Sequence, residues 1–145
     1  MNARLILVLA CMWVPGACKP KEVITPSVGK IWKAALVKEN GTVVFQAGNT
    51  GNARPGYEQF RLDLTRTEEV VYTDLDGRRL TGAWSFSTDN RRLILENLSP
   101  PPSASVGNVE FYLSSPPTNT TLMLKRTNES RKTGNTVNEY ELVPE

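Results

Sequence analysis

Short runs of alternating apolar and polar residues follow one another along most of the chain. In Phe60-Arg61-Leu62-Asp63-Leu64 every second side chain is apolar, and Glu139-Tyr140-Glu141-Leu142 has the same spacing. A period of two residues is typical of strands that bury one face and expose the other. The pattern predicts strands over residues 30–38, 42–47, 57–65, 69–74, 79–87, 91–97, 109–115, 120–127 and 137–143.

The segments between these predicted strands are rich in turn-forming residues. Asn40-Gly41 and Asp76-Gly77 are the strongest hairpin signals, because such pairs accept positive φ angles at little cost. Gly82, inside a predicted strand, indicates a bulge or a tight bend in a barrel wall. Short strands at regular spacing predict an all-β fold. We expect an antiparallel up-and-down β-barrel; the alternative is an immunoglobulin-like β-sandwich, which has a similar number of strands but Greek-key connections.

The N-terminal residues have the order of a secretory signal peptide. Arg4 supplies a positive charge, an apolar run extends from Leu5 to Val14, and small residues then precede Cys18. This order marks a targeting segment rather than an element of the fold, and the run is about half the roughly 20 residues that a spanning helix needs. We therefore expect a cleaved signal at residues 1–17, a tether at 18–28 and one domain at 29–145.

Cys18 at the expected cleavage site resembles the signal of bacterial lipoproteins. The resemblance implies that Cys18 becomes the first residue and carries acyl chains such as palmitate, which would attach the protein to a membrane of the cell envelope. No acidic residue follows at Lys19-Pro20, which favours the outer membrane. Pro15 stands where the lipoprotein pattern has Leu or another aliphatic residue. The alternative is therefore a secreted protein cut near Ala17, with Cys18 as a free thiol.

The cysteine count also bounds how the domain is held together. Cys11 and Cys18 are the only cysteines in the sequence. Cleavage before Cys18 would leave one of them, so an intramolecular disulfide is excluded in the processed protein. The domain must then be stabilised by its hydrophobic core.

Several short motifs after residue 28 resemble the lipocalin-like domains of bacterial lipoproteins, which are common in Bacteroidota. The motifs are Tyr72-Thr-Asp-Leu-Asp-Gly77, Thr81-Gly-Ala-Trp84, Asp89 ahead of Leu93-Ile-Leu95, Leu122-Met-Leu124 and Tyr140-Glu-Leu142 before Pro144. That family typically begins with a Gly-x-Trp-like motif, and Gly29-Lys-Ile-Trp32 carries one residue more. The resemblance implies a lipocalin-like β-barrel and brings no catalytic residues with it.

The composition excludes several classes of chemistry. There is no histidine among the 145 residues, which removes the commonest general base and the commonest metal ligand. Asp74 and Asp76 are the best carboxylate pair, but Arg78-Arg79 follow where a calcium loop needs further oxygen ligands, so we interpret the pair as a hairpin turn. The 17 basic and 15 acidic residues are scattered, without the basic stripe of a nucleic-acid-binding protein. We expect no enzyme activity, no cofactor, no metal and no nucleic-acid partner.

The remaining expectation is a binding module. An eight-stranded barrel is just wide enough to hold one small ligand or to be filled by its own side chains. If it is hollow, a small apolar or amphipathic ligand would contact the aromatic residues expected on its lining: Phe60, Tyr72, Trp84, Phe86 and Phe111. The alternative is a protein-interaction or inhibitor module that acts through a sheet edge or through the long loops at residues 48–56, 98–108 and 128–136. We expect a monomer in either case.

Overall fold

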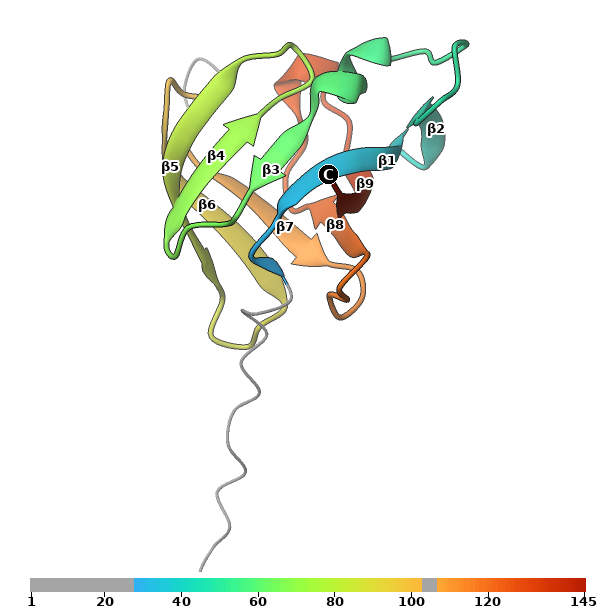
Figure 1. The fold of residues 1–145 in the computed structure, drawn as a ribbon. Helices are drawn as coiled ribbons and strands as arrows, with labels where there is room; N and C mark the ends of the chain where they lie inside the picture. Colours follow the sequence, from blue (N-terminus) through green and yellow to red (C-terminus); the bar gives the residue numbers. More distant parts are fainter. Residues whose placement is uncertain (1–27, 103–106) are drawn as a thin grey trace, which may run out of the picture.

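The computed structural model describes residues 28–102 and 107–145. In this part of the chain the polypeptide forms β-strands and two short 3-10 helices, η1 and η2 (Figure 1). The elements are β1 (Ile31–Glu39), β2 (Thr42–Gln46), η1 (Pro55–Gln59), β3 (Arg61–Asp63), β4 (Glu69–Thr73), β5 (Arg79–Phe86), β6 (Arg92–Ser99), β7 (Val109–Leu113), β8 (Leu122–Arg126), η2 (Arg131–Thr133) and β9 (Asn138–Pro144). The predicted all-β class is confirmed.

The strands form one antiparallel sheet that closes on itself. From β3 to β9 every strand pairs with the next one in the chain, and β9 pairs back along β1, from Trp32 opposite Pro144 to Glu39 opposite Asn138. The closed barrel thus has eight strands, and β2 lies outside the ring as a hairpin extension of β1. The up-and-down order confirms the predicted barrel, so the sandwich alternative is wrong.

β1 divides one of its edges between two partners. Residues Ile31, Trp32 and Lys33 pair with β3, whereas Leu36 to Glu39 pair with β2. The hairpin turn between β1 and β2 has positive φ angles at Asn40 (49°) and Gly41 (82°), as its sequence predicts. β2 and β3 do not pair with each other, so the strand pairing has a gap between them.

Helix η1 fills this gap, and here the predicted strand over residues 57–65 is wrong in its first part. Pro55 sits at the start of the helix, which suits its fixed φ. Gly56 passes so close to the Leu75 carbonyl that a Cβ atom would collide with it. These two residues turn the chain, and the Tyr57 side chain is fully buried in the gap, within 6.2 Å of the Phe45 ring. Strand geometry begins only at Arg61.

The bulge predicted at Gly82 is present. The register between β5 and β6 shifts between Thr81 and Ala83, so that Asn97 and Leu98 lie opposite Gly82 alone. Asn97 has a φ of 55°, and a Cβ atom at Gly82 would collide with the Glu96 carbonyl. A bulge of this kind bends the strand and increases its twist, which helps an eight-stranded sheet to close.

The interior is filled by side chains from alternate positions of the strands. Aromatic rings occupy its middle: Tyr140 lies between Phe60 and Phe111, at centroid distances of 5.0 and 5.7 Å, and Phe60 meets Tyr72 at 5.5 Å. Two indoles are held at the end where β1 begins, since Trp32 Nε1 donates to Val28 O at 2.8 Å and Trp84 Nε1 to Arg66 O at 2.9 Å. We call this end the closed end.

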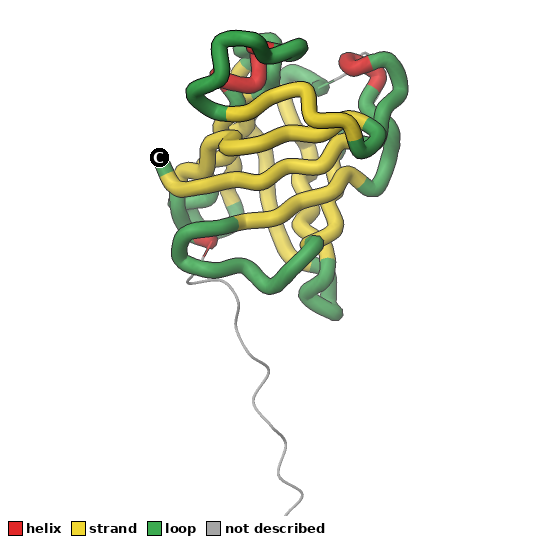
Figure 2. The backbone as a smooth tube through the Cα atoms, turned by 90° about the vertical axis from the view of Figure 1, so that its right-hand side faces the viewer, coloured by secondary structure: helices red, strands yellow, loops and turns green. Residues whose placement is uncertain are grey.

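The opposite end of the barrel carries the helices η1 and η2 and the turns that follow β4 and β8. Figure 2 shows the strands as the wall of the barrel, with loops and short helices at its ends. Val28, the first described residue, lies at the closed end. No helix of the described residues is long and apolar enough to cross a membrane.

Candidate functional site

The inward-facing positions change from apolar to polar toward the end that carries η1 and η2. On β8 the inward series is Leu122, Leu124 and then Arg126, which is partly buried. The same change occurs from Val70 through Tyr72 to Asp74 after β4, and from Leu142 through Tyr140 to Asn138 on β9. We call this end the polar mouth. Its residues are Glu39, Asp74, Arg126, Asn138 and the hydroxyl groups of Tyr57, Tyr72 and Tyr140.

One part of the polar mouth is a buried hydrogen-bond network around Asn138. The Tyr57 hydroxyl donates to Glu39 Oε1 at 3.1 Å and accepts a hydrogen bond from Asn138 Nδ2 at 3.1 Å. Arg54 covers Glu39 from outside, with Nε 3.4 Å from Oε2. Burial raises the pKa of Tyr57 above its usual value, helped by the neighbouring Tyr140 and Glu39. This part of the mouth is therefore closed by η1 and is structural.

The second part is an ion pair that ties η2 to the turn after β4. Lys132 Nζ lies 2.8 Å from Asp74 Oδ2 and 2.9 Å from Asp76 Oδ2. Asp74 is buried and also accepts hydrogen bonds from the Tyr72 hydroxyl at 3.2 Å and from Leu75 N at 2.8 Å. We call this group the Lys132 latch. It holds the loop between β8 and β9 across the barrel end.

Arg126 is the cation of the polar mouth without a carboxylate partner. Its Nε donates to Asn128 O at 3.3 Å, and within residues 28–102 and 107–145 its guanidinium makes no ion pair. The charge of Arg126 acts on the Tyr140 hydroxyl. Burial raises the pKa of Tyr140 to about 12, and the positive charge of Arg126 limits that rise. A guanidinium has five N–H donors; Arg126 uses donors toward Asn128 O and the Tyr140 side chain, which leaves others that a ligand can reach.

A cavity of about 200 Å³ opens at this point. Asp74 and Glu110 are neutralised in its wall, the first by Lys132 and the second by Arg92 at 2.8 Å. Its volume is below the range of drug-sized pockets, roughly 300–1,000 Å³, and suits a small molecule. The lining residues are Asp74, Pro102, Asn108, Val109, Glu110, Arg126, Thr127, Asn128, Glu129, Ser130, Arg131 and Lys132.

The five aromatic residues expected to line a ligand cavity lie in two places. Phe60, Tyr72 and Phe111 are fully buried and pack around Tyr140, where they form the floor beneath the polar mouth. Trp84 and Phe86 contact each other toward the closed end, with ring centroids 5.8 Å apart. The expected lipidation site, Cys18, lies outside the described residues.

The sequence analysis did not select Arg126, Lys132 or Asn138, and it interpreted Asp74 as part of a turn. A usable signal was nevertheless present. In Leu122-x-Leu124-x-Arg126 and Val70-x-Tyr72-x-Asp74 the inward alternation runs on into a charged residue, which predicts a charge at the barrel end. Nothing in the sequence pairs Lys132 with Asp74, because the two residues come from different loops.

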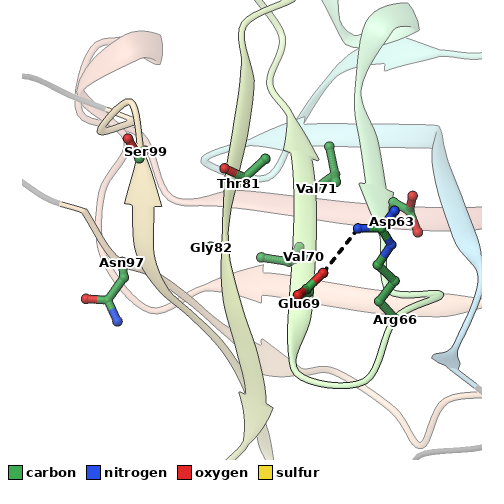
Figure 3. Close-up of a pocket in the computed structure, with 9 residues that line it drawn as sticks. All are labelled: Asp63, Arg66, Glu69, Val70, Val71, Thr81, Gly82, Asn97 and Ser99. Atoms are coloured by element: carbon green, nitrogen blue, oxygen red, sulfur yellow. Dashed lines mark hydrogen bonds and ion pairs between the residues drawn. The ribbon is translucent and has the colours of Figure 1, made fainter.

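Two further hollows lie on the outer surface. The one in Figure 3 spans about 490 Å³ across the outer faces of β4, β5 and β6, at the Gly82 bulge. Arg66 and Glu69 form an ion pair at its rim with N···O at 3.2 Å, and both side chains are mostly exposed. Exposed ion pairs of this kind contribute little to the stability of the fold. The polar mouth is the better candidate because its charged groups are partly withdrawn from water.

Within the described residues no group of three or more His, Cys, Asp or Glu side chains could hold a metal ion. The described part of the polar mouth consists of hydrogen-bonding groups, the Lys132 latch and Arg126, which has no acidic partner there. Such a set of groups can bind and orient a polar molecule.

Comparison with known proteins adds little to this geometry. No family model matches the chain, and no curated protein matches it. A solved structure of an uncharacterized protein from Bacteroides eggerthii DSM 20697 is similar, with a TM-score of 0.49 and 9% sequence identity; the match covers 80% of this chain and 98% of that one.

Proposed function

We propose that the protein is a non-enzymatic, lipocalin-like binding module of a bacterial cell envelope, which holds a small amphipathic ligand in the polar mouth of its barrel. The observation that carries the proposal is the cavity of about 200 Å³ at the one end of the barrel where inward side chains are polar. A few polar groups at the edge of an apolar interior set the orientation of a ligand, while burial of its apolar part contributes affinity.

The filled interior limits what the module takes. Phe60, Phe111 and Tyr140 are at most 3% exposed and in contact with one another. A ligand therefore stays in the cavity at the mouth instead of entering the barrel. Of the five aromatic residues expected to line the site, Phe60, Tyr72 and Phe111 form the floor below the mouth, and Trp84 and Phe86 support the closed end.

The absence of enzyme activity is part of the proposal. The chain has no histidine, and the carboxylates of the mouth are engaged: Asp74 with Lys132 and Glu39 with Tyr57 and Arg54. A general base needs a free group that reaches the substrate. The geometry therefore supports binding better than catalysis.

We place the protein at the outer membrane, attached through acyl chains on Cys18. Val28 lies at the closed end, so a tether that begins at Cys18 enters the barrel opposite the polar mouth. The mouth is then directed away from the lipid surface. Growth with labelled palmitate tests the anchor: the wild-type protein is expected to take up label and to sediment with membranes, and Cys18→Ala to do neither. A labelled Cys18→Ala protein would contradict the assignment.

Native mass spectrometry of the processed protein, released gently from its own envelope, tests the binding function. A reproducible excess mass of one small molecule, lost on denaturation, is the expected result. A bare mass in every preparation would contradict the proposal.

A second candidate, a protein-interaction module, is favoured by Tyr112. This side chain is 49% exposed and borders a surface hollow of about 630 Å³ with Arg91, Leu113 and Pro116. Tyrosine and arginine are enriched in protein interfaces. A sheet edge is less suited to this role, since Arg54 N and Asn52 already bond the outer edge of β2 at Val44 and Gln46. Under this alternative Tyr112→Ser removes co-purification of a partner with the tagged protein.

A further inference from the structure

We infer that the ligand of the polar mouth carries an oxyanion, a carboxylate or a phosphate, which Arg126 binds. The inference rests on the proposed function and names the chemical class of ligand for that site. It begins with the charges that line the cavity.

Two acidic groups of the cavity wall, Asp74 and Glu110, have basic partners. Lys132 contacts Asp74 and Asp76, and Arg92 contacts Glu110. Glu129 is exposed at the rim. Arg126 is different, because it is partly buried, points inward from β8 and makes no ion pair within the described residues. An ion-pair partner supplied by a ligand would balance a charge that is already withdrawn from water.

The groups beside Arg126 cannot replace an anion. Its Nε donates to the carbonyl of Asn128 at 3.3 Å. Its charge also acts on the hydroxyl groups of Tyr72 and Tyr140, and burial raises the pKa of both, so they stay neutral. The guanidinium is a planar fork that matches the two oxygens of a carboxylate or phosphate. The wall at Val109 and Pro102 then receives the apolar part of the ligand.

Four probes with the same six-carbon tail and different head groups test the inference. Hexanoate and hexyl phosphate are anionic, hexanol is neutral, and hexylammonium is cationic. Each is titrated into the ¹⁵N-labelled protein carrying Cys18→Ala, which removes the expected acylation site and keeps the rest of the chain. Amide shifts of Val109, Thr127 and Ser130, and the Nε–H resonance of Arg126, report binding at the mouth.

We expect one or both anionic probes to shift these resonances, and hexanol and hexylammonium to leave them unchanged. Preference between hexanoate and hexyl phosphate separates a carboxylate ligand from a phosphate ligand. Arg126→Gln is expected to weaken the affinity for the anionic probe by about tenfold or more. Arg126→Lys should lose part of that affinity, because an ammonium is a point charge without the fork. Arg79→Gln, an exposed arginine at the same end, is the matched control and should bind as the wild type does.

Two results would overturn the inference. If hexanol or hexylammonium binds at the mouth as strongly as the anions do, the ligand need not carry an oxyanion, although the proposed binding function would still stand. If none of the four probes shifts the resonances of the mouth, the inference is also overturned. Native mass spectrometry then tests the binding function separately. If Arg126→Gln does not fold, Arg126→Lys and a salt titration of the wild-type protein decide instead. Binding of an anionic probe at Arg126 should weaken as sodium chloride rises. Anion binding that does not change with salt or in Arg126→Lys would overturn the inference.

Discussion

The Lys132 latch offers a direct test of how the polar mouth is held together. Lys132→Met removes the ammonium group and keeps a side chain of similar length. The change leaves the Asp74 carboxylate buried, at 6% side-chain exposure, with the Tyr72 hydroxyl and Leu75 N as its remaining donors. Asp76 loses the same partner but is 37% exposed and gains water instead. Most of the cost should therefore come from Asp74.

The two limits for such a cost are well separated. Removing one partner of a fully buried ion pair costs about 3–5 kcal/mol, whereas an exposed pair is worth about 0–1 kcal/mol. Lys132 is 18% exposed, which places the latch between these limits but closer to the buried one. Since Asp74 keeps two donors, we expect a loss of about 2 kcal/mol in the free energy of unfolding. With a urea dependence of about 1.5 kcal/mol per molar, the midpoint falls by about 1.3 M.

Urea unfolding followed by tryptophan fluorescence measures this effect, because Trp32 and Trp84 are both buried. Lys125→Met is the control: Lys125 pairs with Glu139 at 3.0 Å on the barrel surface, with side-chain exposures of 46% and 38%. It should change stability by less than about 1 kcal/mol. Adding Asp74→Asn to Lys132→Met should recover part of the loss. Equal effects of Lys132→Met and Lys125→Met would refute the assignment of the latch as a buried ion pair.

Two further predictions concern pH and backbone packing. Burial opposes the charge of Asp76, but hydrogen bonds from Lys132 and Arg78 N and their positive charges lower its pKa below 3.8. A group with a lowered folded-state pKa contributes stability above its unfolded pKa, and this stability is lost as the pH falls through the folded-state pKa. Between pH 5 and pH 2 the wild-type protein should therefore lose more stability than Asp76→Asn in urea titrations, and parallel curves of stability against pH would contradict this. Gly82→Ala should lower the free energy of unfolding by about 1–3 kcal/mol, because the new Cβ atom would collide with the Glu96 carbonyl. Gly29→Ala is the control and should cost little, since no atom lies nearer than 3.7 Å to a Cβ at that position. Equal midpoints of thermal unfolding for the two variants would contradict this prediction.

Much of the wall of the barrel could be predicted from short stretches of sequence. Alternation located the strands, Asn40-Gly41 the first hairpin and Gly82 the bulge. Each of these features depends on backbone angles and side-chain directions set within a few residues. The same reasoning was wrong at Tyr57, because its burial against Phe45 and Tyr140 is a tertiary contact that overrides local alternation.

The sequence by itself determined the class of fold and the positions of most strands. It also excluded catalysis and metal binding by histidine, because the chain has none. Only the tertiary structure decided between a closed barrel and a sandwich, since closure is the pairing of β1 with β9 from opposite ends of the chain. It also decided that aromatic rings fill the interior and that Asp74, Arg126, Lys132 and Asn138 meet at one end. Such features depend on strand stagger and on the volumes of side chains distant in sequence, which no local pattern records.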